Sequence, residues 1–383
     1  GHKYMRIVIA PDSFKGSLSA GQAAAYIEEG IRRVIPSCAI DKIPIADGGE
    51  GTVEAMVAAT GGEIVKASVC GPLMEEVDSF FGILGDGQTA VVETASAAGL
   101  TLVPPGKRNP MLTTTYGMGQ LILAALDRGC RKFIIGLGGS ATVDGGAGLL
   151  SALGVKFLDK DGRAVPPGGG GLGMLRKIDL SGLDRRVKEC EFLVACDVDN
   201  PLCGERGAAA VFGPQKGATP EMVEVLDRNL KNYGDIIKET TGRDVADAAG
   251  AGAAGGLGAG LMAFLNASLV PGVQMVLETV GFSDRVKDAD LVITGEGSID
   301  RQTLYGKAPM GVAGIARRFG IPVVAVAGTV KGDVSPLYNE GFAAVVSICP
   351  GPITVEEAME RAGSLLADTA ERIMRLIILR KIT

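Results

Sequence analysis

Short apolar runs, each followed by a glycine-rich polar turn and then by a helical pattern, recur at both ends of the chain. Residues 5–10 form the first run, and apolar positions at helical spacing follow over residues 19–34. A second unit has a predicted strand over 41–45 and a predicted helix over 53–59. Strands that alternate with helices predict a parallel α/β sheet, whose turn residues gather at the carboxyl ends of its strands.

The pattern changes in the middle of the chain. Over residues 63–93, short apolar segments alternate with glycine-containing turns, which is typical of antiparallel hairpins. The last part of the chain returns to the strand and helix alternation of the first part. We therefore predict one α/β domain formed by residues 5–62 plus 283–383, and an inserted mixed α/β domain formed by residues 63–282.

Further elements follow from the same patterns. Helices are predicted over 114–127, 220–240, 257–265, 312–319 and 355–376, and strands over 133–135, 192–195, 291–294, 323–327 and 343–348. The glycine-rich stretch before residue 257 and the stretch 295–300 are predicted as loops.

Composition favours an enzyme. The chain has 383 residues, 46% of them hydrophobic, with 57 glycines and no tryptophan, as expected for an α/β protein with many tight turns. A net charge of −6 argues against a nucleic-acid partner. The seven cysteines are odd in number and form no C-x-x-C pair, so we expect reduced thiols and a cytoplasmic location. Residues 248–277 carry no charge, but their glycines and polar residues argue against a membrane span.

The only histidine is His2. We expect residues 1–4 to be a cloning remnant before a natural start at Met5. Histidine is then excluded as a general base, and catalysis must use carboxylates and lysines.

The loop after residues 133–135 admits three interpretations. Gly136 to Ala141 satisfies G-x-G-x-x-A, and Asp159 follows at the distance of a dinucleotide fingerprint. Asp144, however, would repel a bare pyrophosphate in that turn unless a divalent cation lay between them, which favours metal-bound ATP over NAD. The third interpretation is a glycine turn that only lets a helix pack closely on a sheet.

Carboxylates follow several predicted strands in the same glycine-rich context. They are Asp12, Asp47, Asp144, Asp197 and Glu296. Any one of them is explained by helix capping or by a turn. Five in the same context indicate a shared site.

Phosphoryl transfer needs a phosphate cradle, a divalent metal, cations and a carboxylate that accepts the hydroxyl proton. The predicted cradle comprises Gly138, Gly139, Ser140, Ala141, Asp144 and Gly145, with Gly255 and Gly256 as a second candidate. Asp197 with Asn200 or Asp199 offers oxygen ligands for Mg²⁺. The candidate cations are Lys15, Lys216 and Lys307, and the favoured base is Asp47, with Asp197 as its rival. No P-loop motif is present in the sequence.

Six motifs occur in one order along the chain: residues 10–17, 46–52, 138–146, 197–202, 212–217 and 294–300. With these motifs the chain resembles the type I glycerate kinases from Met5 to about Leu376. The resemblance implies phosphorylation of D-glycerate by ATP with Mg²⁺, usually at the 2-hydroxyl. It also implies a flavodoxin-like domain interrupted by a domain similar to restriction endonucleases.

A small anion with one carboxylate and two hydroxyls needs a cationic or N–H clamp and a nearby acid. Lys15 and the Ser13 hydroxyl suit the clamp, and Asp47 suits the attacking hydroxyl. The remaining predicted substrate contacts are Asp12, Glu50 and Glu296. A glycerate 3-kinase, an NAD-dependent dehydrogenase and an ATP-binding regulator without catalysis are the alternatives. The product carbon, the metal preference and the oligomeric state stay open at this point, a homodimer included.

Overall fold

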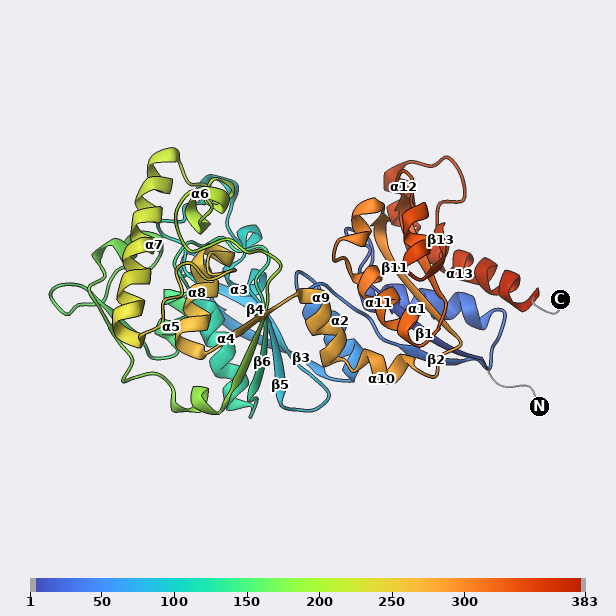
Figure 1. Cartoon of the computed structure of the whole chain (residues 1–383), viewed down its shortest axis with the longest axis horizontal. Coiled ribbons are helices and arrows are strands. Elements are labelled where there is room, and N and C mark those ends of the chain that lie inside the picture. Colours follow the sequence, from blue (N-terminus) through green and yellow to red (C-terminus); the bar gives the residue numbers. More distant parts are fainter. Residues whose placement is uncertain (1–4, 380–383) are drawn as a thin grey trace. The chain divides into compact units, whose positions relative to one another are not determined.

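The computed structural model describes residues 5–379, so the expected remnant at residues 1–4 lies outside the described residues. The chain divides into two compact units (Figure 1). Unit 1 comprises the residues up to Asp47, Glu54–Gly61 and the residues from Val273 onward. Unit 2 comprises Gly48–Val53 and Gly62–Gly272.

Unit 1 is built on a parallel sheet. Its strands are β1 (Arg6–Pro11), β2 (Ala39–Lys42), β11 (Leu291–Ile299), β12 (Val323–Val330) and β13 (Phe342–Ser347), in the order β13-β12-β11-β1-β2. All neighbouring pairs are parallel, which confirms the predicted parallel sheet. Its helices are α1 (Ala20–Arg32), α2 (Thr52–Thr60), α10 (Phe282–Val286), α11 (Ala308–Arg318), α12 (Val355–Glu360) and α13 (Ala362–Ile378), with the first residues of α2 belonging to unit 2.

Helices α1 and α13 share one core with this sheet. Ile27 of α1 and Met374 of α13 are buried in the same cluster as Ile7 of β1. The two helices approach closely, because a Cβ at Gly30 would lie 2.1 Å from the carbonyl oxygen of Ala367. A larger residue at position 30 would force the helices apart.

Two predictions for unit 1 were wrong. Residues 295–299 belong to strand β11, because Glu296 pairs with Ala327 and Ile299 with Val330 in the neighbouring strand. The predicted helix 355–376 is two helices, which are separated at Arg361.

Unit 2 is built on a six-stranded mixed sheet in the order β10-β9-β6-β5-β4-β3. Strands β3 (Glu63–Cys70), β4 (Glu76–Ile83) and β5 (Thr89–Glu93) are antiparallel neighbours, which confirms the predicted hairpins. Strands β5, β6 (Lys132–Gly136), β9 (Glu191–Ala195) and β10 (Ser268–Val270) are parallel. Strands β7 (Lys156–Leu158) and β8 (Lys177–Asp179) form a separate two-stranded sheet.

The helices of unit 2 pack around the six-stranded sheet. They are α3 (Ala95–Ala98), α4 (Tyr116–Asp127), α5 (Ala147–Ala152), α6 (Ala208–Phe212), α7 (Pro220–Thr241) and α8 (Ala253–Leu265). Helix α9 (Gly272–Thr279) begins at Gly272, the last residue of unit 2. The first turn of α8 has left-handed backbone at Ala254, Gly255 and Gly256, so the predicted glycine loop is present inside the assigned helix. Within residues 5–379, no helix has the length and apolar character that crossing a membrane requires.

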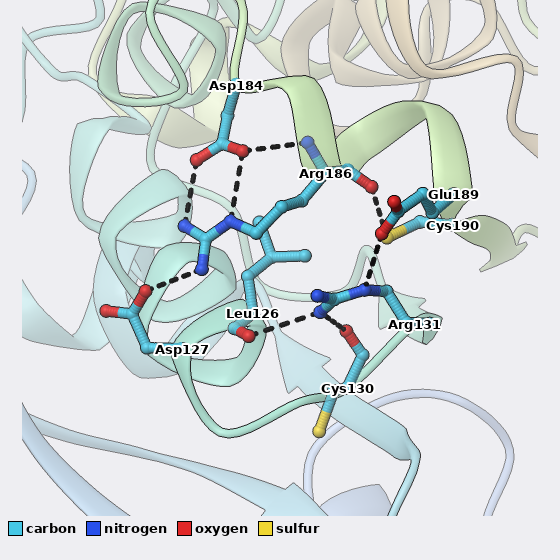
Figure 2. Close-up of polar contacts among 8 residues, drawn as sticks. All are labelled: Leu126, Asp127, Cys130, Arg131, Asp184, Arg186, Glu189 and Cys190. Atoms are coloured by element: carbon cyan, nitrogen blue, oxygen red, sulfur yellow. Dashed lines mark hydrogen bonds and ion pairs between the residues drawn. The ribbon is translucent and has the colours of Figure 1, made fainter.

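An ion-pair network joins the end of α4 to the turn that precedes β9 (Figure 2). Arg186 donates to both carboxylate oxygens of Asp184 and, over 2.7 Å, to Asp127. Arg131 donates to Glu189 and to the carbonyl oxygens of Leu126 and Cys130. This network, defined here as the arginine clip, lies where β6 and β9 begin, whereas the predicted site loops follow the ends of these strands.

Candidate active site

The loop that follows β6 has an exposed tip. Gly138 and Gly139 are exposed, and Gly139 has a φ of +75°, which favours glycine. No hydrogen bond within residues 5–379 uses the N–H groups of Gly138, Gly139 or Ser140. Successive unused N–H groups in a glycine turn form an anion-binding concavity. This tip is therefore the part of the predicted phosphate cradle that a ligand can reach.

The second half of the loop is buried, and several of its N–H groups are bonded inside the protein. Ala141 donates to Ala98 over 2.8 Å, and Gly145 donates to Gly255 over 2.9 Å. Gly255 and Gly256 are buried behind this half of the loop. Ala141, Gly145, Gly255 and Gly256 thus offer no accessible N–H group to a phosphate. The predicted cradle is narrowed to the exposed tip of the loop.

Asp144 organises the buried half of the loop. Its side chain is 1% exposed and accepts hydrogen bonds from the N–H and hydroxyl groups of Thr115 and from the N–H groups of Gly146 and Gly148, all between 2.9 and 3.2 Å. Burial raises the pKa of this carboxyl group, and the bonds from Thr115 and the glycines oppose the rise. Asp144 consequently supports the loop from inside, and its predicted role at the phosphates stays a prediction.

Thr115 is a partner of Asp144 that sequence reasoning missed. Its hydroxyl donates to Asp144 and accepts from the N–H group of Leu149 over 3.0 Å. The residue precedes α4 in sequence and belongs to none of the six motifs, so no sequence signal pointed to it.

Lys216 lies beneath the same loop. Its ammonium group donates to the carbonyl oxygen of Thr142 over 2.7 Å, and the residue is 6% exposed. Burial lowers the pKa of Lys216 to about 7, while the charge of Asp144 acts in the opposite direction. The hydroxyl of Tyr233 donates to Gly145 over 2.9 Å. Lys216 therefore holds the loop from inside, and its predicted contact with ATP stays a prediction.

The candidate site of unit 1 combines two half-buried carboxyl groups and one lysine. Asp12 follows β1 and accepts from the N–H group of Ser13 over 2.6 Å. Glu296 lies on β11, 3.9 Å from the ammonium nitrogen of Lys307 and 3.5 Å from the hydroxyl of Thr303. Asp12, Glu296 and Lys307 come from three different segments of the chain, which only the fold brings close together.

Both carboxyl groups titrate near neutrality. Burial raises the pKa of Asp12 to about 7, the bond from Ser13 lowers it, and the neighbouring charge of Asp47 raises it again. Burial also raises the pKa of Glu296 to about 7, against the effect of Lys307. Each group therefore exists partly as a neutral hydrogen-bond donor at physiological pH.

The remaining predicted residues of this group are exposed. Lys15 and Asp47 belong to unit 1, and Asp47 lies near enough to Asp12 to affect its pKa. Glu50 belongs to unit 2, within Gly48–Val53, so the structure does not group it with Asp12 in one unit.

The predicted metal ligands lie in the loop after β9. Asp197 is exposed, and its Oδ1 accepts from the N–H group of Gly272 over 3.2 Å. Asn200 donates to the carbonyl oxygen of Arg206, and Asp199 pairs with Arg206 over 3.2 Å. Among residues 5–379, no group of three or more histidine, cysteine or acidic side chains forms a metal site. The donors present suit Mg²⁺ only where phosphates and water supply most of its ligands.

The dinucleotide interpretation fails in the fold. A ribose-binding acid must lie near the loop's own sheet, whereas Asp159 follows β7, which belongs to the separate sheet. Asp159 accepts from the N–H groups of Asp161 and Arg163 and closes a turn. The N–H groups at the start of α5 are used by Asp144, so this helix start offers no pyrophosphate site.

The parallel sheet of unit 1, the mixed sheet of unit 2 and the glycine loop after β6 define an α/β protein with unused N–H groups in a loop at the end of a strand, as counted within residues 5–379. The chain belongs to the glycerate kinase family, whose model matches residues 7–378. The family resemblance predicted from the six motifs is therefore confirmed.

Relatives cover nearly the whole chain. It is 53% identical over 377 residues to a glycerate kinase of Bacillus subtilis, with 98% of this chain and 99% of the relative covered. It is 51% identical to the glycerate 2-kinase of Escherichia coli, with 94% of each chain covered. A crystal structure assigned as glycerate kinase 2 from Salmonella typhimurium LT2 matches with a TM-score of 0.92 and 48% identity over 100% of both chains.

Proposed function

We propose that the protein transfers the γ-phosphoryl group of ATP to the 2-hydroxyl of D-glycerate, giving 2-phosphoglycerate and ADP. The observation that carries the proposal is membership of the glycerate kinase family across residues 7–378. The choice of the 2-hydroxyl rests on the 51% identity to the glycerate 2-kinase of Escherichia coli. A glycerate 3-kinase is the alternative.

ATP phosphates would bind at the tip of the loop after β6. Gly138, Gly139 and Ser140 supply three N–H groups that are not used within residues 5–379. Donors directed at phosphate oxygens stabilise the charge that develops during transfer. Thr115, Asp144 and Lys216 would act on ATP only indirectly, because they hold the shape of this loop from inside.

Glycerate would bind at the polar groups of unit 1. Lys15 and the Ser13 hydroxyl would bind the substrate carboxylate, and Asp47 would accept the proton of the attacking hydroxyl. Asp12 and Glu296, which titrate near neutrality, can each donate a hydrogen bond to the anionic substrate when protonated. Glu50 is retained as a proposed substrate contact.

Mg²⁺ would be held by Asp197 together with Asn200 or Asp199. Mg²⁺ is commonly bound by one or two carboxylates, while phosphates and water supply its other ligands, and Asp197 is exposed as this arrangement requires. When bound, the ion would neutralise charge on the phosphates. Asp197 remains the rival of Asp47 as the base.

The two units correspond to two proposed domains. The order β13-β12-β11-β1-β2, read by position along the chain, is the 2-1-3-4-5 order of flavodoxin-like folds. We assign residues 5–62 plus 283–383 to this domain and residues 63–282 to an inserted domain similar to restriction endonucleases. A cytoplasmic location is part of the same proposal, and a homodimer is left to measurement.

The test is ³¹P NMR of the product formed from D-glycerate and Mg·ATP. The expected result is an ADP signal together with 2-phosphoglycerate. A 3-phosphoglycerate signal would favour the 3-kinase. ATP binding without ADP formation would favour a regulator, and a fluorescence change of NADH without ADP formation would favour a dehydrogenase.

A further inference from the structure

Glu93 is a buried carboxylate that belongs to none of the six motifs. It is the last residue of β5 and is 5% exposed. Its Oε1 accepts from the N–H group of Gly51 over 3.1 Å, and its Oε2 accepts from the N–H group of Val53 over 3.0 Å. Both oxygens thus bind the segment Gly48–Val53, which belongs to unit 2 although the chain on both sides of it belongs to unit 1.

The same segment lies against the ends of the next two strands. A Cβ at Gly136, the last residue of β6, would lie 2.2 Å from the carbonyl oxygen of Gly48. A Cβ at Gly48 would lie 2.5 Å from the Cβ of Ala195, the last residue of β9. Because β5, β6 and β9 are adjacent parallel strands, three consecutive strand ends hold the segment.

The segment also has an internal turn that fixes its shape. Gly48 and Gly51 have φ angles of +94° and +89°, which favour glycine. Thr52 is 1% exposed, and its hydroxyl donates to the carbonyl oxygen of Gly49 over 2.6 Å. Glu93 supplies the charged contact to this turn.

The segment carries chemistry. Asp47 directly precedes it and Glu50 lies within it. A shift of the segment would displace both carboxylates, and a displacement of about 1 Å in a catalytic group can cost about 10²-fold in rate.

We propose that Glu93 is a positioning residue for phosphoryl transfer, which holds Gly48–Val53 and thereby sets the positions of Asp47 and Glu50. This inference rests on the proposed function, because it takes Asp47 as the base. Glu93 contacts backbone N–H groups and touches no reacting atom in this scheme. Carboxylate bonds to N–H groups are charge-assisted and stronger than neutral ones, which suits an anchor.

The test compares Glu93→Gln with Glu93→Asp. Glutamine keeps the size of the side chain, but its NH₂ group cannot accept a hydrogen bond, so one of the two buried N–H groups loses its partner. We expect E93Q to lower kcat by about 10²-fold while the KM for ATP stays within about 2-fold of wild type. Aspartate keeps the charge and both acceptors, so E93D should recover part of the lost kcat.

Thr89→Val is the matched control. Thr89 begins the same strand, is 2% exposed and donates to Asp86 at the opposite end of β5 from Glu93. T89V should lower stability and leave kcat unchanged. A wild-type kcat in E93Q, or an equal loss of kcat in T89V, would overturn the proposal.

Amide hydrogen exchange separates this inference from the proposed function. Exchange at Gly51 and Val53 should become at least about 10-fold faster in E93Q and should not change in T89V. Unchanged exchange in E93Q overturns the anchor even if wild type phosphorylates glycerate. Faster exchange in E93Q, together with no glycerate turnover by the wild-type protein, supports the anchor and places the failure in the proposed function.

Discussion

The ammonium group of Lys216 donates a hydrogen bond to the carbonyl oxygen of Thr142 over 2.7 Å, inside unit 2. A buried lysine is costly unless it is bonded, so its presence beneath the glycine loop indicates that the shape of the loop depends on it.

Replacing Lys216 by methionine should weaken ATP binding. Methionine is slightly shorter than lysine and apolar at its end, so the change leaves the Thr142 carbonyl oxygen without its ammonium donor, and a hydrogen bond from a charged donor contributes about 1.5–3 kcal/mol. We expect the KM for ATP to rise about 10-fold or more, measured by coupled ADP release. The exposed Lys160→Met serves as control. An unchanged ATP KM in K216M would show that the loop does not need this anchor.

Asp47→Asn and Lys15→Ala should each lower kcat by about 10²-fold or more with the fold intact, because each removes one positioned electrostatic group from the proposed chemistry. Steady-state kinetics and circular dichroism test this pair. Glu54→Gln, an exposed change in the same unit, should retain turnover. Near-wild-type turnover in both site variants would end the assignment.

Asp12→Asn should change the pH dependence of stability. Because burial raises the pKa of Asp12 from 3.8 to about 7, the native state holds a proton that the unfolded state has lost between these values. Native stability therefore falls as pH rises from about 4 to about 7 and stays reduced above 7. D12N should remove this loss, on the order of 1–3 kcal/mol at pH 8.

Urea unfolding between pH 4.5 and 8.5 measures this effect. Asp288→Asn, which replaces an exposed carboxyl group in unit 1, should follow the wild-type profile. Glu296→Gln should behave as D12N does, because burial raises the pKa of Glu296 in the same direction. The account fails if D12N and wild type show parallel stability profiles.

Asp197→Asn should raise the Mg²⁺ concentration needed for half-maximal activity, by at least about 10-fold at saturating ATP. The reason is the loss of the exposed carboxylate that the proposal gives to the metal. Asp199→Asn discriminates between the two carboxylates of this loop. If D197N needs the same Mg²⁺ concentration as wild type for half-maximal activity, whereas D199N needs a higher one, Asp199 is the ligand.

Arg186→Met should destabilise the protein without changing catalysis. It removes the central residue of the arginine clip, whose bonds to Asp184 and Asp127 lie where β6 and β9 begin (Figure 2). The loss is expected to be about 1 kcal/mol, since these ion pairs are partly exposed. Urea unfolding measures it, with the exposed Arg185→Met as control. A reduced kcat in R186M would contradict a purely structural role for the clip.

Local patterns predicted much of the secondary structure. The strand at 133–135 and the helix at 220–240 correspond to β6 and α7, because apolar spacing and capping act over a few residues. The glycine-containing stretch 295–300 predicts a loop after a strand that ends at Thr294. Pairing with β1 and β12 outweighed this local signal and placed Glu296 on β11.

The candidate site was predicted only in part, for a physical reason. Sequence motifs locate glycine loops, but they do not show which N–H groups remain available. Ala141 and Gly139 belong to the same motif, yet Ala141 donates to Ala98, whereas Gly139 has no such bond within residues 5–379. Asp144 likewise resembled a ligand-facing acid until its four internal donors were known.

The sequence by itself determined the family and the chemistry-bearing loops, because both depend on residue identity and spacing along the chain. The tertiary structure alone decided which of those residues are buried supports and which are exposed. Glu93 shows the difference: its partners Gly51 and Val53 lie about 40 residues away in sequence, and only the fold of unit 2 brings them to its carboxylate.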